Sequence, residues 1–505
     1  MLQMQMSRYR TYLVFFFLVF FSACATLCPT EPRLFPERLA ACQDLLNRLD
    51  KTVQQAGVKD RSSFSVPCFP YLRSNRFLSA LKKTLKSDEE RADWLRWMQQ
   101  LDLAARNKEI RNLPDETVLS LNSKEAGPPD REGLYRRVAS CSCELLDHDQ
   151  TQSDFCETFD PFVEIPDGYS FFMRAAGLYP LTSIPVIIAT RNVREKIRSR
   201  FQLDVEDLPV EGTLRTFVPA EGVFLGETGV RELIKTSREN AMGVPRPNRT
   251  QERALVAFFA PIFIQDVAAS YDRFGRVVWK GGRVVIESAE PTVYWYMSHA
   301  FLEGEAILQI NYVIWYSKRA GKKSPWMERG DLDGLTVRVS LDTRGRPFMV
   351  DVMNNCGCYH FFSPQKERVH RVVSKRFGLD PFVPQWLPTI FPEKRLGIRV
   401  NSGWHQVERL LATAPPLDAE PYELAPYEAL EALAHENGRS ESIFNARGIG
   451  KGSDRIEPFI LFSMGIPSVG SMRQRGNHPI ALTGRVHFDD PYLFEQNFVF
   501  KSGEP

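Results

Sequence analysis

Strand signals crowd into residues 254–365 and constrain the fold more than any other feature of the chain. Two runs of strand-forming residues, 276–280 and 283–287, flank Gly281-Gly282, a pair that is typical of a tight hairpin. Further β-branched and aromatic runs follow at 293–298, 307–316, 335–341 and 348–353. So many strand signals in one short stretch predict a largely antiparallel sheet.

Residues 24–125 carry helical signals instead. In 35–57, apolar side chains recur at intervals of three and four residues, and Pro36 and Gly57 suit the two ends of a helix. A second helix is predicted at 75–86. Ser87 and Glu90 have the pattern of a capping box, which predicts a third helix that runs to about Ile110. We therefore expect a small helical domain ahead of the sheet.

The remaining segments are less regular. A Gly- and Pro-rich run predicts that 126–160 is a linker followed by a short helix with two cysteines. Residues 161–253 are interpreted as mixed, with an apolar strand at 184–189. A helix at about 426–437 and Gly-rich, irregular chain fill 366–505. Together these patterns predict an α+β fold: an N-terminal helical domain, a largely antiparallel β-sheet domain, and an irregular C-terminal lobe that packs on the sheet.

The first residues have the layout of an export signal. Arg8 and Arg10 precede the apolar run 11–21, which is shorter than the roughly 20 residues of a membrane-spanning helix. The residues before Cys24 resemble a bacterial lipobox, so 1–23 is interpreted as a signal peptide and Cys24 as a lipidated first residue. Simple cleavage and an uncleaved anchor stay open as alternatives. We expect an outer-membrane lipoprotein that faces the periplasm, with a soluble periplasmic or secreted protein as the alternative.

Composition narrows the class of partner. Hydrophobic residues make up 43% of the 505 residues and charged residues 25%, which is typical of a globular protein and excludes a disordered chain. The 64 Lys and Arg residues nearly balance the 62 Asp and Glu residues, so we expect no nucleic acid partner. The expected partners are the membrane, through an N-terminal lipid, and an envelope protein or cell-wall component.

The nine cysteines predict disulfides, because an exported protein folds in an oxidising compartment. If Cys24 carries a lipid, the candidates for pairing are Cys28, Cys42, Cys68, Cys141, Cys143, Cys156, Cys356 and Cys358. Spacing alone does not choose the pairs. One hypothesis keeps the three earliest cysteines together in the helical domain and brings the next three to the last two.

The most distinctive candidate site is Cys356-Gly-Cys358-Tyr-His360, at the end of a predicted strand. Two thiols and an imidazole this close together suit zinc or copper, and a thiol nucleophile with a histidine base is a second interpretation. Disulfide formation is favoured over both in an oxidising compartment.

The C-terminal segment supplies further metal candidates, His478, His487 and Asp489, which with His360 would form a mixed imidazole–carboxylate set. Such a set can activate water for hydrolysis. The spacing matches no ligand motif, and hydrogen bonding within a Gly-rich lobe is the favoured interpretation. No cofactor is therefore predicted, with zinc or another divalent metal as the alternative, and no catalytic residue is assigned.

Several stretches resemble a group of exported, lipoprotein-like proteobacterial proteins to which no activity is assigned. These are FPYLRSNRFL (69–78), GLYPLTSIP (177–185), LDGLTVRVSLD (332–342), CGCYHFF (356–362) and the segment 471–491. The resemblance spans the whole architecture and implies no reaction. Two functions stay open. One is an envelope lipoprotein with a binding or structural role, stabilised by disulfides. The other is a periplasm-facing hydrolase with a metal or thiol site near the segments CGCYH (356–360) and HFDD (487–490).

Overall fold

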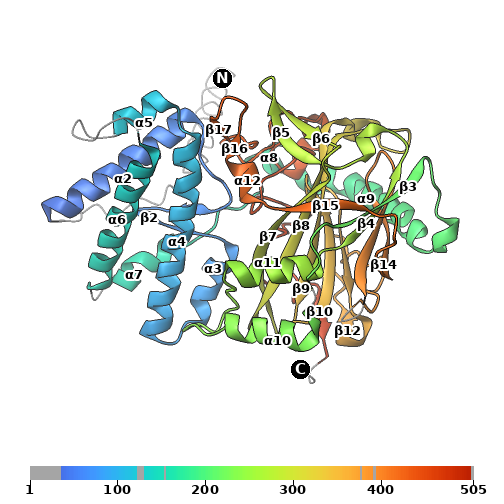
Figure 1. Cartoon of the computed structure of the whole chain (residues 1–505), viewed down its shortest axis with the longest axis horizontal. Helices are drawn as coiled ribbons and strands as arrows, with labels where there is room; N and C mark the ends of the chain where they lie inside the picture. The colour runs from blue at the N-terminus through green and yellow to red at the C-terminus, as the bar shows by residue number, and fades with distance from the viewer. Residues whose placement is uncertain are drawn as a thin grey trace, which may run out of the picture.

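The computed structural model describes residues 36–121, 130–152, 155–223, 225–375, 378–390 and 394–501 (Figure 1). An N-terminal helical region is followed by a large, curled, mixed sheet and an irregular C-terminal part, so the fold is α+β as predicted. The predicted signal peptide, Cys24 and Cys28 lie outside the described residues.

The helical region confirms most of the predicted helices. Asn75 caps its helix by accepting a hydrogen bond from the Leu78 amide, and Ser87 and Glu90 form the predicted capping box. The cysteine-containing helix that was predicted to be short, Arg131–Gln150, is 20 residues long. It packs against the helices Glu37–Ala56 and Asp88–Asn112. The elements are α2 (Glu37–Ala56), β1 (Phe64–Val66), β2 (Phe69–Ser74), α3 (Arg76–Leu81), α4 (Asp88–Asn112), α5 (Asp115–Leu121), α6 (Arg131–Gln150) and α7 (Phe155–Phe159).

The main sheet has ten strands in the order β11-β10-β9-β8-β7-β15-β3-β4-β13-β14. The junctions β7–β15, β15–β3 and β4–β13 are parallel, and the others are antiparallel. The strands are β3 (Thr213–Pro219), β4 (Ile262–Val267), β7 (Thr292–Leu302), β8 (Glu305–Arg319), β9 (Gly330–Leu341), β10 (Pro347–Asn354), β11 (His360–Pro364), β13 (Arg395–Val400), β14 (Val407–Thr413) and β15 (Glu420–Pro426).

Shorter elements cover the sheet. The predicted Gly-Gly hairpin forms as β5 (Arg276–Lys280) and β6 (Arg283–Glu287), and it packs on the face of β7 and β8. The C-terminal lobe packs on β10 and β11, as predicted. The remaining elements are α8 (Phe171–Ala176), α9 (Tyr179–Phe201), α10 (Gly226–Ser237), α11 (Arg249–Phe259), β12 (Val369–Val372), α12 (Glu428–Glu431), β16 (Leu433–Ala434), β17 (Ser440–Glu441), α13 (Glu457–Ile460) and β18 (Phe498–Phe500).

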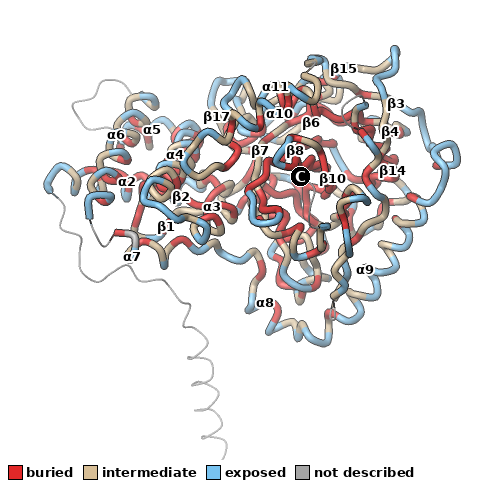
Figure 2. Tube along the Cα trace, turned by 90° about the horizontal axis from the view of Figure 1, so that it is seen from below, coloured by how far each residue is buried: buried red, intermediate tan, exposed pale blue. Residues whose placement is uncertain are grey.

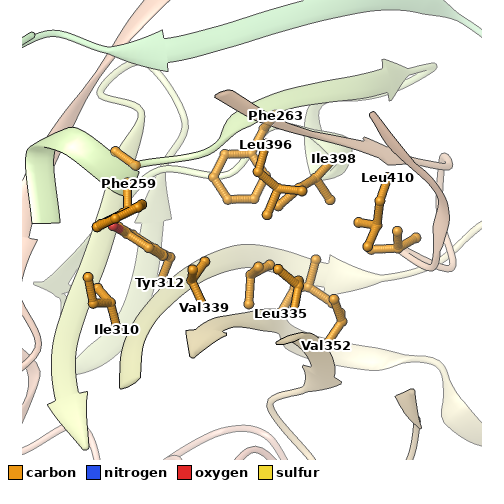
Figure 3. Close-up of a cluster of buried hydrophobic side chains, with 14 of the residues drawn as sticks. Phe259, Phe263, Ile310, Tyr312, Leu335, Val339, Val352, Leu396, Ile398 and Leu410 are labelled. Atoms are coloured by element: carbon orange, nitrogen blue, oxygen red, sulfur yellow. The ribbon is translucent and has the colours of Figure 1, made fainter. Parts of the chain in front are cut away.

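The curl of the sheet encloses its largest core. Figure 3 shows Phe263, Leu396 and Leu410 facing Leu335 and Val352 across this core, although the two groups come from opposite ends of the strand order. Because the sheet folds back on itself, its edge strands β11 and β14 approach each other, and Gln385 bridges them by hydrogen bonds to Ser363 of β11 and to Leu410 of β14.

Helix α9 closes the seam between these two edges. It contacts β14, and the ring of Phe201 meets the ring of Phe361 on β11 with 5.4 Å between their centres. Ile197 and Phe201 are buried in the main core. The second half of α9 therefore covers the gap between the two edge strands. The first half of α9 lies over the end of this seam.

Two predictions of secondary structure were wrong. The apolar run 184–189 is part of α9 and not a strand; Ile184 and Ile188 are more than half exposed, so the run is not buried as a central strand would be. The helix predicted at 426–437 is reduced to the four residues of α12. The chain leaves the helix after Glu431, whose buried carboxylate binds Lys108 of the helical region at 2.7 Å and Arg475 at 2.8 Å.

Candidate functional site

A cavity of about 860 Å³ is lined on one side by α9 and on another by the edge strand β11; we call it the seam cavity. Helix α9, strand β11, the chain around Phe382, α13 and the C-terminal lobe all contribute to its wall. Most of the wall is apolar: Ile184, Val186, Ile187, Val193, Phe361, Leu379, Phe382, Ile460, Leu461, Ile480, Leu482 and Val486. Polar and charged side chains make up the rest of the wall, among them Arg194, Glu328, Cys358, His360, Lys375, Asp380, Glu457 and Arg485. Small-molecule sites have this composition and volume.

The Cys-Gly-Cys segment forms the turn between β10 and β11. Gly357 has a φ of +81°, and a Cβ there would lie 2.4 Å from the carbonyl oxygen of Pro479, so only glycine fits. The turn lets the backbone amide of Cys358 donate a hydrogen bond to Sγ of Cys356 at 3.3 Å. Cys356 is buried behind the wall, whereas Cys358 lines the cavity.

Both cysteines of this turn are free thiols, and their pKa values are shifted in opposite directions. Burial opposes ionisation of Cys356, but the hydrogen bond from the Cys358 thiol and the positive charge of Arg319 outweigh it and lower its pKa. The hydrogen bond to Cys356, with burial, raises the pKa of Cys358 well above its usual value. The pair therefore loses its first proton from Cys356 and keeps the second on Cys358.

Glu457, at the start of α13, is the most unusual group in the cavity wall. Its side chain is buried, and Oε2 has no hydrogen-bond partner among the described residues. Burial, followed by the negative charges of Cys356 and Glu328, raises its pKa to about 8. At neutral pH this carboxyl group is mostly protonated, so it can donate a hydrogen bond to a molecule in the cavity.

A buried network of charges supports the wall from behind. Arg319 binds the Asp333 carboxylate through two nitrogens, at 2.8 and 3.0 Å, and Glu328 at 2.8 Å. His405 lies between Asp333 at 2.8 Å and Asp272 at 3.2 Å. Burial disfavours the charged form of His405, but these two carboxylates outweigh it and raise its pKa. The network fixes Glu328, which also accepts hydrogen bonds from Tyr359 and Trp404, at the edge of the cavity.

The predicted metal candidates do not come together. His360 lines the seam cavity and binds Asp351 at 2.8 Å, and Asp351 in turn pairs with Arg338. His478 bonds the carbonyl of Asn355 at 3.2 Å, with burial lowering its pKa to about 3. His487 accepts from the Gly168 amide at 3.2 Å, with burial lowering its pKa to about 4. In the described part of the chain, no group of three or more His, Cys, Asp or Glu side chains is placed to hold a metal ion.

Asp489 lies in a different cavity, a cleft of about 1070 Å³ between the helical region and the sheet. It pairs with Arg76 at 3.3 Å, and burial raises its pKa to about 6. The cleft is crowded with arginines, but most of them already pair with carboxylates, as Arg338 does with Asp351 and Arg475 does with Glu431. The seam cavity is therefore the stronger candidate site.

The disulfides differ from the predicted grouping. Cys42 of α2 is bonded to Cys141 of α6, so Cys141 does not meet the Cys-Gly-Cys turn, and that part of the hypothesis was wrong. Cys68 is also disulfide-bonded, whereas Cys143 is an exposed free thiol. The side chain of Cys156 lies outside the described residues. The predicted bridges to Cys356 and Cys358 are not formed in this structure.

Sequence reasoning found the two thiols and His360 but missed the other polar groups of the site. Arg319, Glu328 and Glu457 stand in no motif, and only the folded chain brings them to the thiols. The sequence offered one signal for these polar groups: Arg319 is a charged residue in a strand whose other side chains are mostly apolar.

Comparisons of the chain with protein-family models, with curated proteins and with solved structures match none of them. In the part of the chain that the structure describes, no helix is long and apolar enough to cross a membrane.

Proposed function

We propose that this protein is an exported, lipid-anchored envelope protein that binds an amphiphilic molecule in the seam cavity. One observation carries the binding function: the cavity joins a mostly apolar wall to polar and charged side chains, among them the buried carboxyl group of Glu457. Small-molecule sites combine an apolar lining with polar groups that orient the ligand.

The chemistry of the wall defines the ligand class. An apolar tail would lie against α9 and β11, where burial of its surface contributes about 25 cal/mol per Å². A carbonyl or carboxyl head would accept a hydrogen bond from the protonated Glu457. A fatty acid or an acyl ester has both parts, whereas a fully polar metabolite would leave the apolar wall without a partner.

Binding is tested with a fluorescent long-chain fatty acid. Ser183 is a buried cavity residue on α9, so Ser183→Trp fills the space and is expected to weaken binding by about tenfold or more. Ser199→Trp makes the same change at an exposed position of the same helix and is expected to leave the affinity unchanged. Equal effects of the two substitutions, or no saturable binding to the unaltered protein, would exclude the seam cavity as the binding site.

Export and anchoring rest on separate observations. The apolar run and the lipobox-like residues before Cys24 favour a lipidated N-terminus, and the disulfide between Cys42 and Cys141 suits an oxidising compartment. The resemblance to exported proteobacterial proteins favours the same location. Labelled palmitate should be incorporated into the protein in a bacterial host and lost on Cys24→Ser; incorporation that survives this substitution would contradict the proposal.

A thiol hydrolase is the second candidate, and the free thiol of Cys358 in the cavity wall favours it. In this reaction, Sγ of Cys358 attacks the carbonyl carbon of an acyl ester and passes its proton to the Cys356 thiolate. The alcohol leaves with a proton from Glu457; water then cleaves the thioester to a free acid and the Cys358 thiol, and the proton held by Cys356 passes to Glu457, so that both groups return to their starting forms. With a long-chain p-nitrophenyl ester as substrate, Cys358→Ala should abolish hydrolysis and the covalent acyl adduct, whereas Cys143→Ala should change neither. An unchanged rate in Cys358→Ala would leave binding as the function.

A further inference from the structure

Large apolar side chains are exposed together at the mouth of the seam cavity. Phe171 and Phe172 of α8 are 64% and 72% exposed, and Phe459 of α13 is 85% exposed. We call this surface the apolar face and define it by Phe171, Phe172, Leu178, Leu181, Ile184 and Phe459. Contiguous apolar patches of this kind mark interaction sites in soluble proteins.

The elements that carry the apolar face lie side by side, although they are far apart in the sequence. Helix α8 contacts α9, and both contact the short turn 462–464 that follows α13. In Figure 2, α8 and α9 lie along the same rim of the molecule, with pale blue, exposed stretches on both. The residues around 171–190 and 456–462 therefore present their apolar side chains in the same region.

The apolar face is held firmly, although it is exposed. Arg174 of α8 is buried, and it donates hydrogen bonds to the carbonyls of Met464 at 2.9 Å and Gly484 at 2.6 Å. Its guanidinium also stacks on the rings of Tyr169 and Tyr179, 4.5 and 4.4 Å from their centres. These contacts fix α8 to the C-terminal lobe, so the exposed phenylalanines are part of a well-packed element and not of a loose end.

Helix α9 has the charge pattern of a helix at a membrane interface. Its first half, up to Thr190, carries no charged residue and fully buries only Ser183, so none of its large apolar side chains is fully buried in the core. Its second half carries Arg191, Lys196 and Arg200, besides Arg194, which lies in the cavity wall, and Arg198, which pairs with the one acidic residue of the helix, Glu195. Apolar side chains next to a basic segment complement an anionic bilayer, which offers acyl chains below negative headgroups.

We propose that the apolar face docks on an anionic phospholipid bilayer and turns the mouth of the seam cavity toward the acyl chains. Ile184 belongs to the apolar face and also lines the cavity, and Ile460, the neighbour of Phe459 in the chain, lines the cavity as well, so the two surfaces are continuous. A lipid chain can then pass from the bilayer into the cavity without crossing water. Docking stands on the exposed residues and charges alone, whereas the transfer of a lipid rests on the proposed function.

The test uses the full chain reconstituted into vesicles of phosphatidylglycerol and phosphatidylethanolamine that contain a phospholipid with a diazirine on its acyl chain. After irradiation, mass spectrometry is expected to find lipid adducts on peptides covering 171–188 and 456–462, besides any adducts on the N-terminal peptide. The triple variant Phe172→Ser/Leu181→Ser/Phe459→Ser should lower the first set by about tenfold and leave the N-terminal set unchanged.

The matched control removes exposed apolar side chains elsewhere. Leu417, in the loop before β15, and Leu119, on α5 of the helical region, are fully and 49% exposed and lie on none of the elements of the apolar face, so Leu417→Ser/Leu119→Ser should leave every adduct unchanged. Adducts confined to the N-terminal peptide, no adducts at all, or equal labelling of the triple variant would each overturn the docking proposal. If adducts form on the apolar face but the protein does not bind the fluorescent fatty acid, the docking proposal stands and the fatty acid is excluded as the ligand.

Discussion

The disulfide between Cys42 and Cys141 gives the sharpest prediction for stability. It ties α2 to α6 across 99 residues of chain. In the chain-entropy account, closing a loop of about 100 residues destabilises the unfolded state by about 4.7 kcal/mol at 25 °C, and removal of native disulfides costs about 2–5 kcal/mol in practice. We therefore expect Cys42→Ser to lower the free energy of unfolding of the helical region by about 2–5 kcal/mol.

Urea unfolding followed by hydrogen exchange in α2 and α6 measures this loss, because exchange reports on the helical region separately from the sheet. Cys143→Ser is the matched control: it lies two residues beyond Cys141 in the same helix but is an exposed free thiol, so its expected effect is within about 0.5 kcal/mol. A loss below about 1 kcal/mol for Cys42→Ser, or an equal loss for both variants, would refute the reasoning.

Three further predictions concern the seam cavity and the network behind it. Arg319→Met leaves the buried carboxylates of Asp333 and Glu328 without their main partner, so urea unfolding should show a loss of about 3–5 kcal/mol, and a loss under about 1 kcal/mol would contradict the assigned network. Gly357→Ala should destabilise the protein more than Gly438→Ala, because both glycines have positive φ but only the first would bring a Cβ to 2.4 Å from a carbonyl oxygen; equal thermal shifts would argue against the tight turn. The pKa of Glu457 is raised to about 8 in the folded protein, above its pKa in the unfolded chain. Its contribution to stability is therefore fully present at a pH below the unfolded-state pKa and is lost as the pH rises toward and through 8. Glu457→Gln should therefore flatten the pH dependence of the urea midpoint between about pH 4.5 and pH 8, and an unchanged slope would show that this carboxyl group ionises normally.

The sheet was largely predictable because its signals are local. The hairpin at Gly281-Gly282 and the alternating run in β9 depend on neighbours a few residues apart, and both formed as predicted. The first half of α9 was misread for the same reason: a run of bulky apolar residues is typical of a buried strand, but here it is an exposed helix. Periodicity does not reveal which surface a short apolar run faces.

The polar part of the site was not predictable, because it is assembled from distant positions. His405 meets Asp272 and Asp333, which lie 133 and 72 residues before it in the chain. Glu457 and Cys356 belong to distant parts of the chain, and only the fold brings them close enough for the charge of Cys356 to raise the pKa of Glu457. The pairing of Cys42 with Cys141 likewise follows from the packing of α2 on α6, a contact that neither spacing nor composition encodes.

A crystal structure of the protein with a bromine-labelled long-chain fatty acid tests the central proposal most directly. The anomalous signal of bromine locates the end of the chain without any assumption about the site. We predict a bromine peak between α9 and β11, with the carboxyl group of the ligand within hydrogen-bond distance of Glu457. A peak only in the cleft beside Asp489, or no ordered bromine at saturating ligand, would contradict the assignment of the seam cavity as the binding site.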